Sequence, residues 1–278
     1  MATNTDNQIA SDGQSEWAFK LWRAYLTGDH SGLGLTVTMA KRVFKWLPSD
    51  TRCRVCNAPF QGLGGAAVSL IGFGAGRSSF NPSLCGRCET IVKKHQVGME
   101  TQLTMLFADV RGSTSLAEQI GAVKFHRLIN RYYVVCVEQL GKTDALINRL
   151  IGDALIGLYV PGIAGPAHGR RAVEAARGLL QATGYGDPAG PWIQVGIGLH
   201  TGAAYVGAVG SSSSVSDITV LGDAANVTAR LAAAAGPGEI LVSEDTCTIA
   251  GLPLSDCEQR VLDLKGRSKP IAVRVISH

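Results

Sequence analysis

From Thr101 onward, the pattern of hydrophobic and polar positions predicts strands that alternate with helices. Short apolar runs predict strands at 102–108, 145–151, 154–160, 192–199, 203–209, 217–221, 239–243, 260–264 and 271–276. Apolar residues that recur every three or four positions predict helices over 115–141, 167–183 and 224–235. The first of these helices opens on a capping box, Ser115 to Glu118. The order βαββαβ predicts a ferredoxin-like α/β sandwich with appended strands.

The chain before Gly98 has a different texture. Residues 1–14 are polar, whereas 15–48 mix aromatic and basic side chains and predict two short amphipathic helices joined by a loop. Aromatic residues at that spacing favour a core or a dimer contact over membrane-surface binding. We therefore expect a polar tail with helices over 1–48, a small glycine-rich module over 49–98, and an α/β domain over 99–278.

Composition and charge exclude several classes of protein. The chain is 46% hydrophobic and 17% charged, so global disorder is excluded. It contains no apolar run of the roughly 18 residues that a membrane span needs, and its start lacks a secretory signal, so we expect a cytoplasmic location. Residues 1–99 carry 11 basic and 6 acidic side chains, a net charge of +5. This excess is too small to predict nucleic-acid binding, and it indicates a solvated face or a weak docking surface for an acidic partner.

The seven cysteines divide into a paired group and a scattered group. An odd number without a secretory signal argues against a disulfide framework. Four of them form two Cys-x-x-Cys pairs with 28 residues between the pairs: Cys53, Cys56, Cys85 and Cys88. This arrangement favours one structural Zn²⁺ per chain, and an iron or iron–sulfur centre or a redox dithiol are the alternatives. We expect the bound metal to fix the N-terminal helices.

Two aspartates lie where a metal site is expected. Asp109 ends an apolar strand, and Asp153 lies in a tight turn between two adjacent strands. Two neighbouring carboxylates repel each other unless a cation lies between them. The residues after Asp109 lead into a helix, whose free N–H groups and dipole attract phosphate. The pattern therefore indicates metal-assisted phosphoryl transfer on a nucleotide, although the two residues taken alone could equally be a helix N-cap and a turn residue.

Four segments of the chain resemble the catalytic domain of class III nucleotidyl cyclases. They are FADVRGSTSLAE (107–118), LIGDALIGLYVPG (150–162), VGIGLHTGAAYVGAVGS (195–211) and TVLGDAANVTARLAAAAGPGEILVS (219–243). The resemblance covers 101–276, includes the closing LDLKGRSKPIAVRVI, and keeps the order and spacing of the family. It implies the palm-like form of the ferredoxin-like sandwich and a lyase that makes a cyclic nucleotide for signal transduction.

The resemblance also implies roles for individual residues. In that family two Mg²⁺ or Mn²⁺ ions per site are held by the aspartates that match Asp109 and Asp153, and by a backbone carbonyl at the position of Val110. The phosphates lie on the turn that here comprises Val110, Arg111, Gly112, Ser113 and Thr114, with Lys265 near the terminal phosphates. Asn226 matches the residue that orients the ribose, and Arg230 matches the arginine that stabilises charge on the α-phosphoryl group in the transition state.

Base selection in the family depends on two positions that here are Arg149 and Thr219. Arginine can only donate hydrogen bonds, which suits N1 of adenine, and threonine can accept one from the adenine amino group. ATP is therefore favoured over GTP, although arginine departs from the more common lysine and could recruit guanine O6 instead.

The family also implies the assembly. Its members form head-to-tail dimers in which one subunit supplies the aspartates and the other supplies the asparagine and arginine, so we expect a homodimer with two shared sites. The leading prediction is an adenylate cyclase that converts ATP to cyclic AMP and pyrophosphate. The alternatives are a guanylate cyclase and a non-catalytic module that senses a nucleotide or binds a partner.

Overall fold

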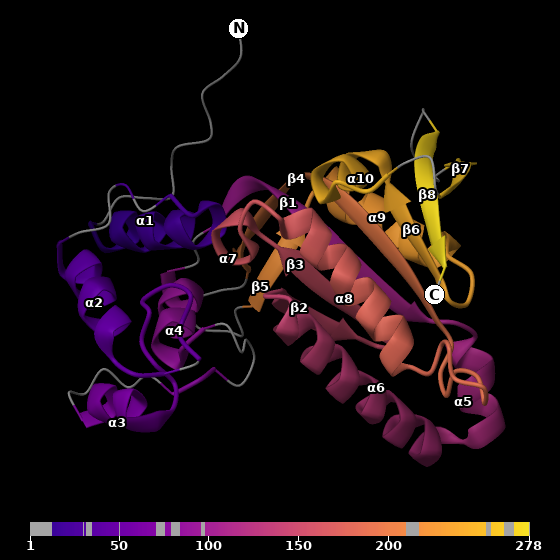
Figure 1. Ribbon diagram of the computed structural model, residues 1–278, viewed down its shortest axis with the longest axis horizontal. Coiled ribbons are helices and arrows are strands. Elements are labelled where there is room, and N and C mark those ends of the chain that lie inside the picture. Colours follow the sequence, from indigo (N-terminus) through magenta and orange to yellow (C-terminus); the bar gives the residue numbers. More distant parts are fainter. Residues whose placement is uncertain are drawn as a thin grey trace, which may run out of the picture. The chain divides into compact units, whose positions relative to one another are not determined.

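A computed structural model describes the fold of the chain (Figure 1). The described residues are 13–29, 31, 35–49, 51–70, 76–78, 84–95, 98–209, 217–253, 257–263 and 270–277. The chain divides into two compact units. The smaller unit comprises Met1–Met99 together with Tyr205–Thr219, and the larger one comprises Glu100–Ala204 together with Val220–His278.

A mixed β-sheet organises the larger unit. Its eight strands within the described residues are β1 (Gly98–Val110), β2 (Leu146–Ile151), β3 (Ala154–Tyr159), β4 (Val195–Val209), β5 (Asp217–Leu221), β6 (Glu239–Ser243), β7 (Glu258–Leu262) and β8 (Ile271–Ser277). The strand order is β2-β3-β1-β4-β6-β8-β7, and β5 pairs with β4. The first four neighbours, β2-β3-β1-β4, have the order of a ferredoxin-like sheet, so the predicted fold class is confirmed.

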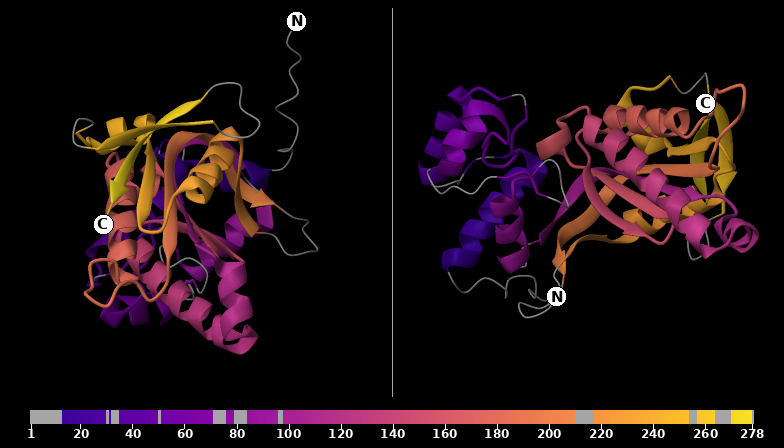
Figure 2. Two further views of the ribbon diagram at one scale, coloured as in Figure 1. Left: turned by 90° about the vertical axis from the view of Figure 1, so that its right-hand side faces the viewer. Right: turned by 90° about the horizontal axis from the view of Figure 1, so that it is seen from below.

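Helices cover both faces of this sheet (Figure 1, Figure 2). They are α5 (Ser113–Ile120), α6 (Ala122–Lys142), α7 (Pro161–Ala164), α8 (His168–Ala182), α9 (Asp223–Ala234) and α10 (Glu244–Ala250). Helices α6 and α8 lie side by side on one face, over the main core. Strand β6 shows the two-sided arrangement, because Ile240 and Val242 belong to that core whereas Leu241 packs with Val227 and Leu231 of α9. Side chains that alternate along a strand are thus buried on both faces.

Four details of the larger unit differ from the sequence prediction. The predicted capping box is wrong, because the helix begins at Ser113 after Gly112, which adopts φ 66° and provides no side-chain cap. The predicted helix over 115–141 is interrupted at Gly121, where φ is 77°. The predicted strands 192–199 and 203–209 are one strand, β4, and the sequence pattern did not predict α10.

The smaller unit contains helices α1 (Gly13–Thr27), α2 (Leu35–Trp46), α3 (Gly62–Leu70) and α4 (Gly86–His95). The two predicted N-terminal helices are therefore present, whereas α3 and α4 were not predicted. Trp22 of α1 is fully buried, and its indole N–H donates a hydrogen bond to the carbonyl of Val206 (3.0 Å). That bond ties α1 to the end of β4 within the same unit.

The core prediction for the N-terminal helices holds for α1 but only partly for α2. On α1, Leu21 and Tyr25 are buried, and on α2 Phe44 is buried. Val43 and Trp46 of α2 are exposed instead. Among the described residues, none of the helices is long and apolar enough to span a bilayer.

Candidate active site and metal centre

The two aspartates lie next to each other at one end of the central strands. Asp109 of β1 pairs with Ala154 of β3, which places Asp153 beside it in the connecting turn. Gly152 allows that turn to be tight because it adopts φ 64°. Neighbouring β1 residues Ala108 and Val110 point into the core under α6 and α8, so Asp109 points to the opposite face of the sheet.

The pKa of the Asp109 carboxyl group is raised overall. Partial burial raises the pKa of its carboxyl group, the guanidinium of Arg111 lowers that pKa, and the charge of Asp153 raises it. The two carboxylates are therefore close enough to repel each other. This is the electrostatic setting in which oxygen ligands bind a divalent cation.

Arg111 links Asp109 to the end of α9. Its guanidinium forms an ion pair with the Asp109 carboxylate and donates hydrogen bonds to the carbonyls of Ala233 (3.0 Å) and Ala235 (3.3 Å). A cation at the C-terminal end of a helix is stabilised by the helix dipole. The Arg111 side chain is thus held by three groups of the same chain, one carboxylate and two backbone carbonyls.

A cavity of about 440 Å³ adjoins Asp153. Ser113 and Thr114 at the start of α5 line one side of it, together with Asp153 from the β2–β3 turn. The structure therefore brings two residues of the predicted phosphate turn together with a predicted metal ligand. The first residues of α5 also offer backbone N–H groups that have no partner within the helix itself, which suits an anion.

The opposite wall of this cavity comes from α6 and was missed in the sequence. His126, Asn130 and Tyr133 line it, and the hydroxyl of Tyr133 donates a hydrogen bond to the carbonyl of Gly152. This bond holds the turn that carries Asp153. The three side chains stand at positions i, i+4 and i+7 of one helix face, a spacing that solvent-facing residues of an amphipathic helix share.

Helix α9 carries Asn226 and Arg230 on its outer face. Asn226 is exposed and Arg230 is half-buried, whereas Val227, Thr228 and Leu231 are buried against the sheet. Neither Asn226 nor Arg230 lines the cavity beside Asp153. A single chain therefore does not gather all of the predicted catalytic residues in that cavity.

The remaining predicted substrate contacts are described only in part. Arg149 lies in β2, and its side chain is outside the described residues. Thr219 is half-buried in β5, and Lys265 falls outside the described residues.

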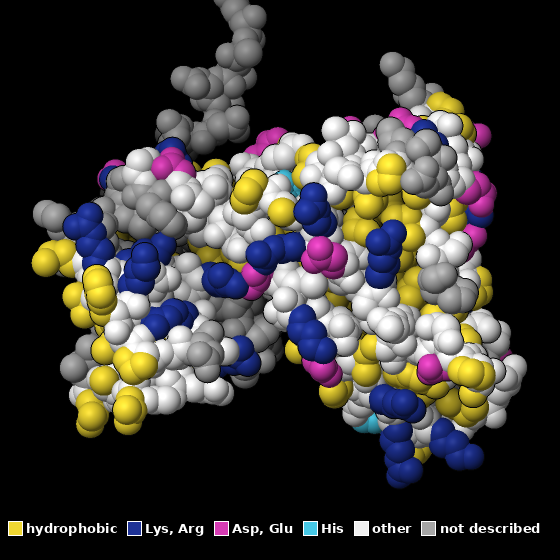
Figure 3. Space-filling model, in the orientation of Figure 1, with side chains coloured by type: hydrophobic (Ala, Val, Ile, Leu, Met, Phe, Trp, Pro, Cys, Tyr) yellow, Lys and Arg dark blue, Asp and Glu magenta, His cyan; other side chains and the backbone are white. Residues whose placement is uncertain are grey.

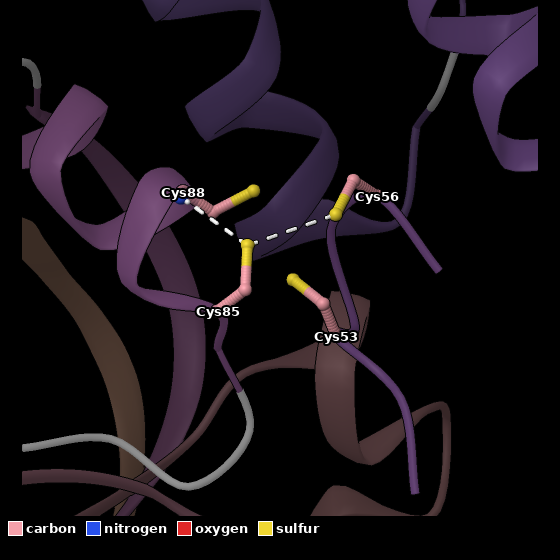
Figure 4. A group of neighbouring side chains, drawn as sticks. All are labelled: Cys53, Cys56, Cys85 and Cys88. Carbon is pink, nitrogen blue, oxygen red and sulfur yellow. Dashed lines mark hydrogen bonds between the residues drawn. The ribbon is translucent and has the colours of Figure 1, made fainter. Parts of the chain in front are cut away.

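The four paired cysteines form a compact, buried cluster in the smaller unit (Figure 4). Their sulfur atoms face a common centre and all lie within 4.8 Å of one another, with 3.8 Å between Cys56 and Cys85. A tetrahedral zinc ion with bonds of about 2.3 Å places sulfur atoms about 3.8 Å apart. The cluster therefore fits a metal ion bound by four thiolates.

The backbone around each Cys-x-x-Cys pair positions the sulfur atoms of this cluster. Asn57 follows the first pair with φ 61°, and the N–H of Cys53 donates to the carbonyl of Ala58 (2.9 Å), which closes a tight loop. In the second pair, the N–H of Cys88 donates to the sulfur of Cys85 (3.4 Å) at the start of α4. Such hydrogen bonds and a helix N-terminus favour thiolates.

The four thiols shift one another's pKa values in opposite directions, and hydrogen bonds from the other three raise the pKa of Cys88 well above its ordinary value. Hydrogen bonds from the other three thiols, with Cys56 the largest contributor, hold the pKa of Cys53 well below its ordinary value. Lys41 of α2, which the sequence did not single out, is close enough for the charges of Cys53, Cys56 and Cys88 to raise its pKa, although burial lowers it overall.

Comparisons with known proteins identify the family of the α/β part of the chain. The profile of the family "Adenylate and Guanylate cyclase catalytic domain" matches residues 96–275. An adenylate cyclase of Anabaena cylindrica is 33% identical over 134 residues, which are 47% of this chain and 26% of the relative. An uncharacterized protein of Mycobacterium tuberculosis is 29% identical over 189 residues, 64% of this chain and 33% of the relative. The chain thus spans about a quarter to a third of the length of these relatives.

Solved structures show the same fold. The adenylyl cyclase CyaB from P. aeruginosa has a TM-score of 0.56 at 24% identity, over 66% of this chain and 97% of that one. The guanylyl cyclase Cya2 has a TM-score of 0.55 at 26% identity, over 64% of this chain and 92% of that one.

Proposed function

Because the chain belongs to the family of adenylate and guanylate cyclase catalytic domains, we propose that it converts ATP to 3′,5′-cyclic AMP and pyrophosphate as a head-to-tail homodimer. The observation that carries this proposal is the position of Asp153, which follows from the pairing of Asp109 with Ala154 and which places its carboxylate in a cavity that Ser113 and Thr114 of α5 also line.

The carboxylates of Asp109 and Asp153 fit Mg²⁺ or Mn²⁺, which prefer oxygen ligands. When bound, two such ions per site would lower the pKa of the ribose 3′-hydroxyl and offset the charge of the triphosphate. The turn from Val110 to Thr114 offers backbone N–H groups to the phosphates. Tyr133 keeps the Gly152–Asp153 turn in place, because its hydroxyl bonds to the Gly152 carbonyl.

The transition-state groups come from the second subunit in this proposal. Asn226 and Arg230 lie on the outer face of α9, opposite the side that packs on the sheet, where a partner could receive them. Asn226 orients the ribose, and Arg230 stabilises the charge that develops at the α-phosphorus. Because each chain carries both sets of residues, a homodimer has two equivalent sites.

The choice of ATP rests on Arg149 and Thr219, with Lys265 near the terminal phosphates. Arg149 donates to adenine N1 and Thr219 accepts from the amino group. The relative with 33% identity that is named an adenylate cyclase supports this choice. GTP is the second candidate, because the guanylyl cyclase Cya2 is 26% identical over 64% of the chain.

The cysteine cluster holds one structural Zn²⁺ in this proposal, with iron as the alternative. It would give the proposed 49–98 module the cohesion that its short helices lack and would fix the helices of 1–48 against it, and the proposed catalytic domain comprises 99–278. The cytoplasm is the proposed compartment, because metal-binding thiols persist where thiols stay reduced.

Product identification tests the proposal directly. The purified chain is incubated with ATP or GTP and Mn²⁺ or Mg²⁺, and the products are identified by mass spectrometry. We expect cyclic AMP and pyrophosphate from ATP, less product from GTP, and none from the Asp109→Ala or Asp153→Ala variants. A larger yield of cyclic GMP from GTP than of cyclic AMP from ATP would move the assignment to guanylate cyclase, and no cyclic nucleotide from either substrate would refute the activity.

A further inference from the structure

Large apolar side chains are exposed along two helices of the smaller unit. On α2, Met39 is 60% exposed, Val43 59% and Trp46 89%. On α3, Leu63 is 83% exposed and Leu70 87%. Side chains of this size at such exposure mark an interaction surface when they adjoin one another.

The exposed residues of each helix share one side. Positions 39, 43 and 46 of α2 stand at i, i+4 and i+7, whereas Phe44 points inward and is only 3% exposed. Leu63 and Leu70 are seven residues apart on α3, which is again one side of a helix. Each helix is therefore anchored by one face and presents a second apolar face outward.

The start of α3 lies against Leu47 and Pro48, which directly follow α2. A Cβ at Gly64 would lie 2.6 Å from the Pro48 carbonyl oxygen and 3.2 Å from Cβ of Leu47, so only glycine permits this approach. Figure 3 shows hydrophobic side chains over both α2 and α3, with basic ones beside them. We call the surface formed by Met39, Val43, Trp46, Leu63 and Leu70 the α2–α3 face.

The charges around this face are positive. Arg42 and Lys45 of α2 are exposed beside it, and α2 contains no acidic residue. Residues 1–99 carry a net charge of +5. A second copy of the same face would bring like charges together, and a nucleic acid would leave the aliphatic side chains in water.

We propose that the α2–α3 face docks on a membrane surface rich in anionic lipids. Trp46 and the aliphatic side chains insert at the boundary between headgroups and acyl chains, while Arg42 and Lys45 contact the lipid phosphates. Neither helix enters far, because α2 has 12 residues and α3 has 9, and Phe44 and Val68 on their inner faces are buried in the protein. This inference concerns the smaller unit and does not depend on the cyclase activity.

Vesicle binding by the full chain tests the proposal. Co-sedimentation is measured with vesicles of phosphatidylcholine alone and with phosphatidylglycerol added. We expect binding only when the anionic lipid is present, and weaker binding as salt screens the charges. The Arg42→Gln and Lys45→Gln changes should each weaken it about fivefold.

Two variants distinguish vesicle binding by the α2–α3 face from non-specific adsorption through any exposed apolar side chain. Trp46→Ser with Leu63→Ser should weaken binding at least about tenfold, whereas Val261→Ser, which changes a 65% exposed valine on β7, should leave it unchanged. Equal binding by both variants, or no binding by the native chain, overturns the proposal. So does an oligomer of the native chain that dissociates only in the Trp46→Ser, Leu63→Ser variant, because a second copy would then cover the face.

Discussion

Gly198 lets α9 pack directly on strand β4. A Cβ added at this position would lie 2.3 Å from the backbone nitrogen of Ala232, 2.7 Å from the carbonyl oxygen of Thr228 and 2.8 Å from Cβ of Leu231. Two of these three atoms are backbone of α9, so no side-chain rotation relieves the contact. The Gly198→Ala variant therefore requires the helix to move away from the sheet.

The size of that movement follows from the distances. Ordinary contacts of a Cβ begin near 3.4 Å, so α9 must retreat by 1.1 Å at Ala232. Overpacking of this kind costs about 1–3 kcal/mol, which lowers the Tm of a domain of this size by about 2–12 °C. The same helix carries Asn226 and Arg230, which we propose as catalytic, and misplacing catalytic groups by about 1 Å lowers a rate on the order of 100-fold.

Thermal unfolding and initial rates of cyclic nucleotide formation measure the two effects on one preparation. Gly141→Ala is the matched control, because Gly141 lies within α6 and a Cβ there would meet nothing within 4 Å. We expect that control to stabilise the protein by about 0.4–1 kcal/mol through the unfolded state and to leave the rate unchanged. If Gly198→Ala retained both the native Tm and the native rate, the role assigned to the position of α9 would be wrong.

Three further predictions concern other contacts. Cys85→Ser should remove the bound metal, seen as loss of zinc by atomic emission and a lower Tm of the smaller unit; an unchanged zinc content would contradict the four-thiolate site. Tyr133→Phe frees the Gly152 turn, so half-maximal activity should need several-fold more Mn²⁺, and an unchanged metal titration would contradict its positioning role. The Arg260 ion pair lowers the pKa of Glu239, so it stabilises the fold above about pH 4.5 and that contribution disappears as the pH falls through the lowered pKa. Glu239→Gln should flatten this part of the Tm profile, and an unaltered profile would show that the pair contributes nothing.

The sequence predicted the central sheet because the strands are short runs of apolar residues or of alternating apolar and polar residues. The helices that cover the sheet have apolar residues at every third or fourth position. It also placed Asp109 and Asp153 on neighbouring strands, since the βαββαβ order of a ferredoxin-like sheet pairs the first strand with the third. The capping box at Ser115 failed for a local reason: Gly112 adopts a left-handed conformation and starts the helix two residues earlier than that motif predicts.

The cavity wall on α6 could not be predicted in the same way. His126, Asn130 and Tyr133 are polar residues on an amphipathic helix, and nothing in such a pattern distinguishes residues that face a cavity from residues that face solvent. The cavity exists because α5 and the β2–β3 turn stand opposite that face, which is a consequence of tertiary structure.

In the four-cysteine module, the site could be predicted from the sequence but a helix could not. The spacing of its cysteines predicted the cluster, whereas the glycine-rich segment between them hid α3. Gly64 and Gly65 suggested a flexible loop, yet a Cβ at either would lie 2.6 Å or 3.0 Å from the nearest atom, the Pro48 carbonyl oxygen and the Phe60 carbonyl carbon respectively. Those glycines serve close packing of a helix, which composition alone cannot distinguish from a turn.

The central claim is that each active site takes its aspartates from one chain and Asn226 with Arg230 from the other. Mixing the Asp109→Ala and Arg230→Ala variants tests it most directly. Each variant alone should be inactive, and random re-association should restore about a quarter of the native activity, because half of the dimers then contain one intact site. No recovery in a mixture shown to contain heterodimers would contradict the claim.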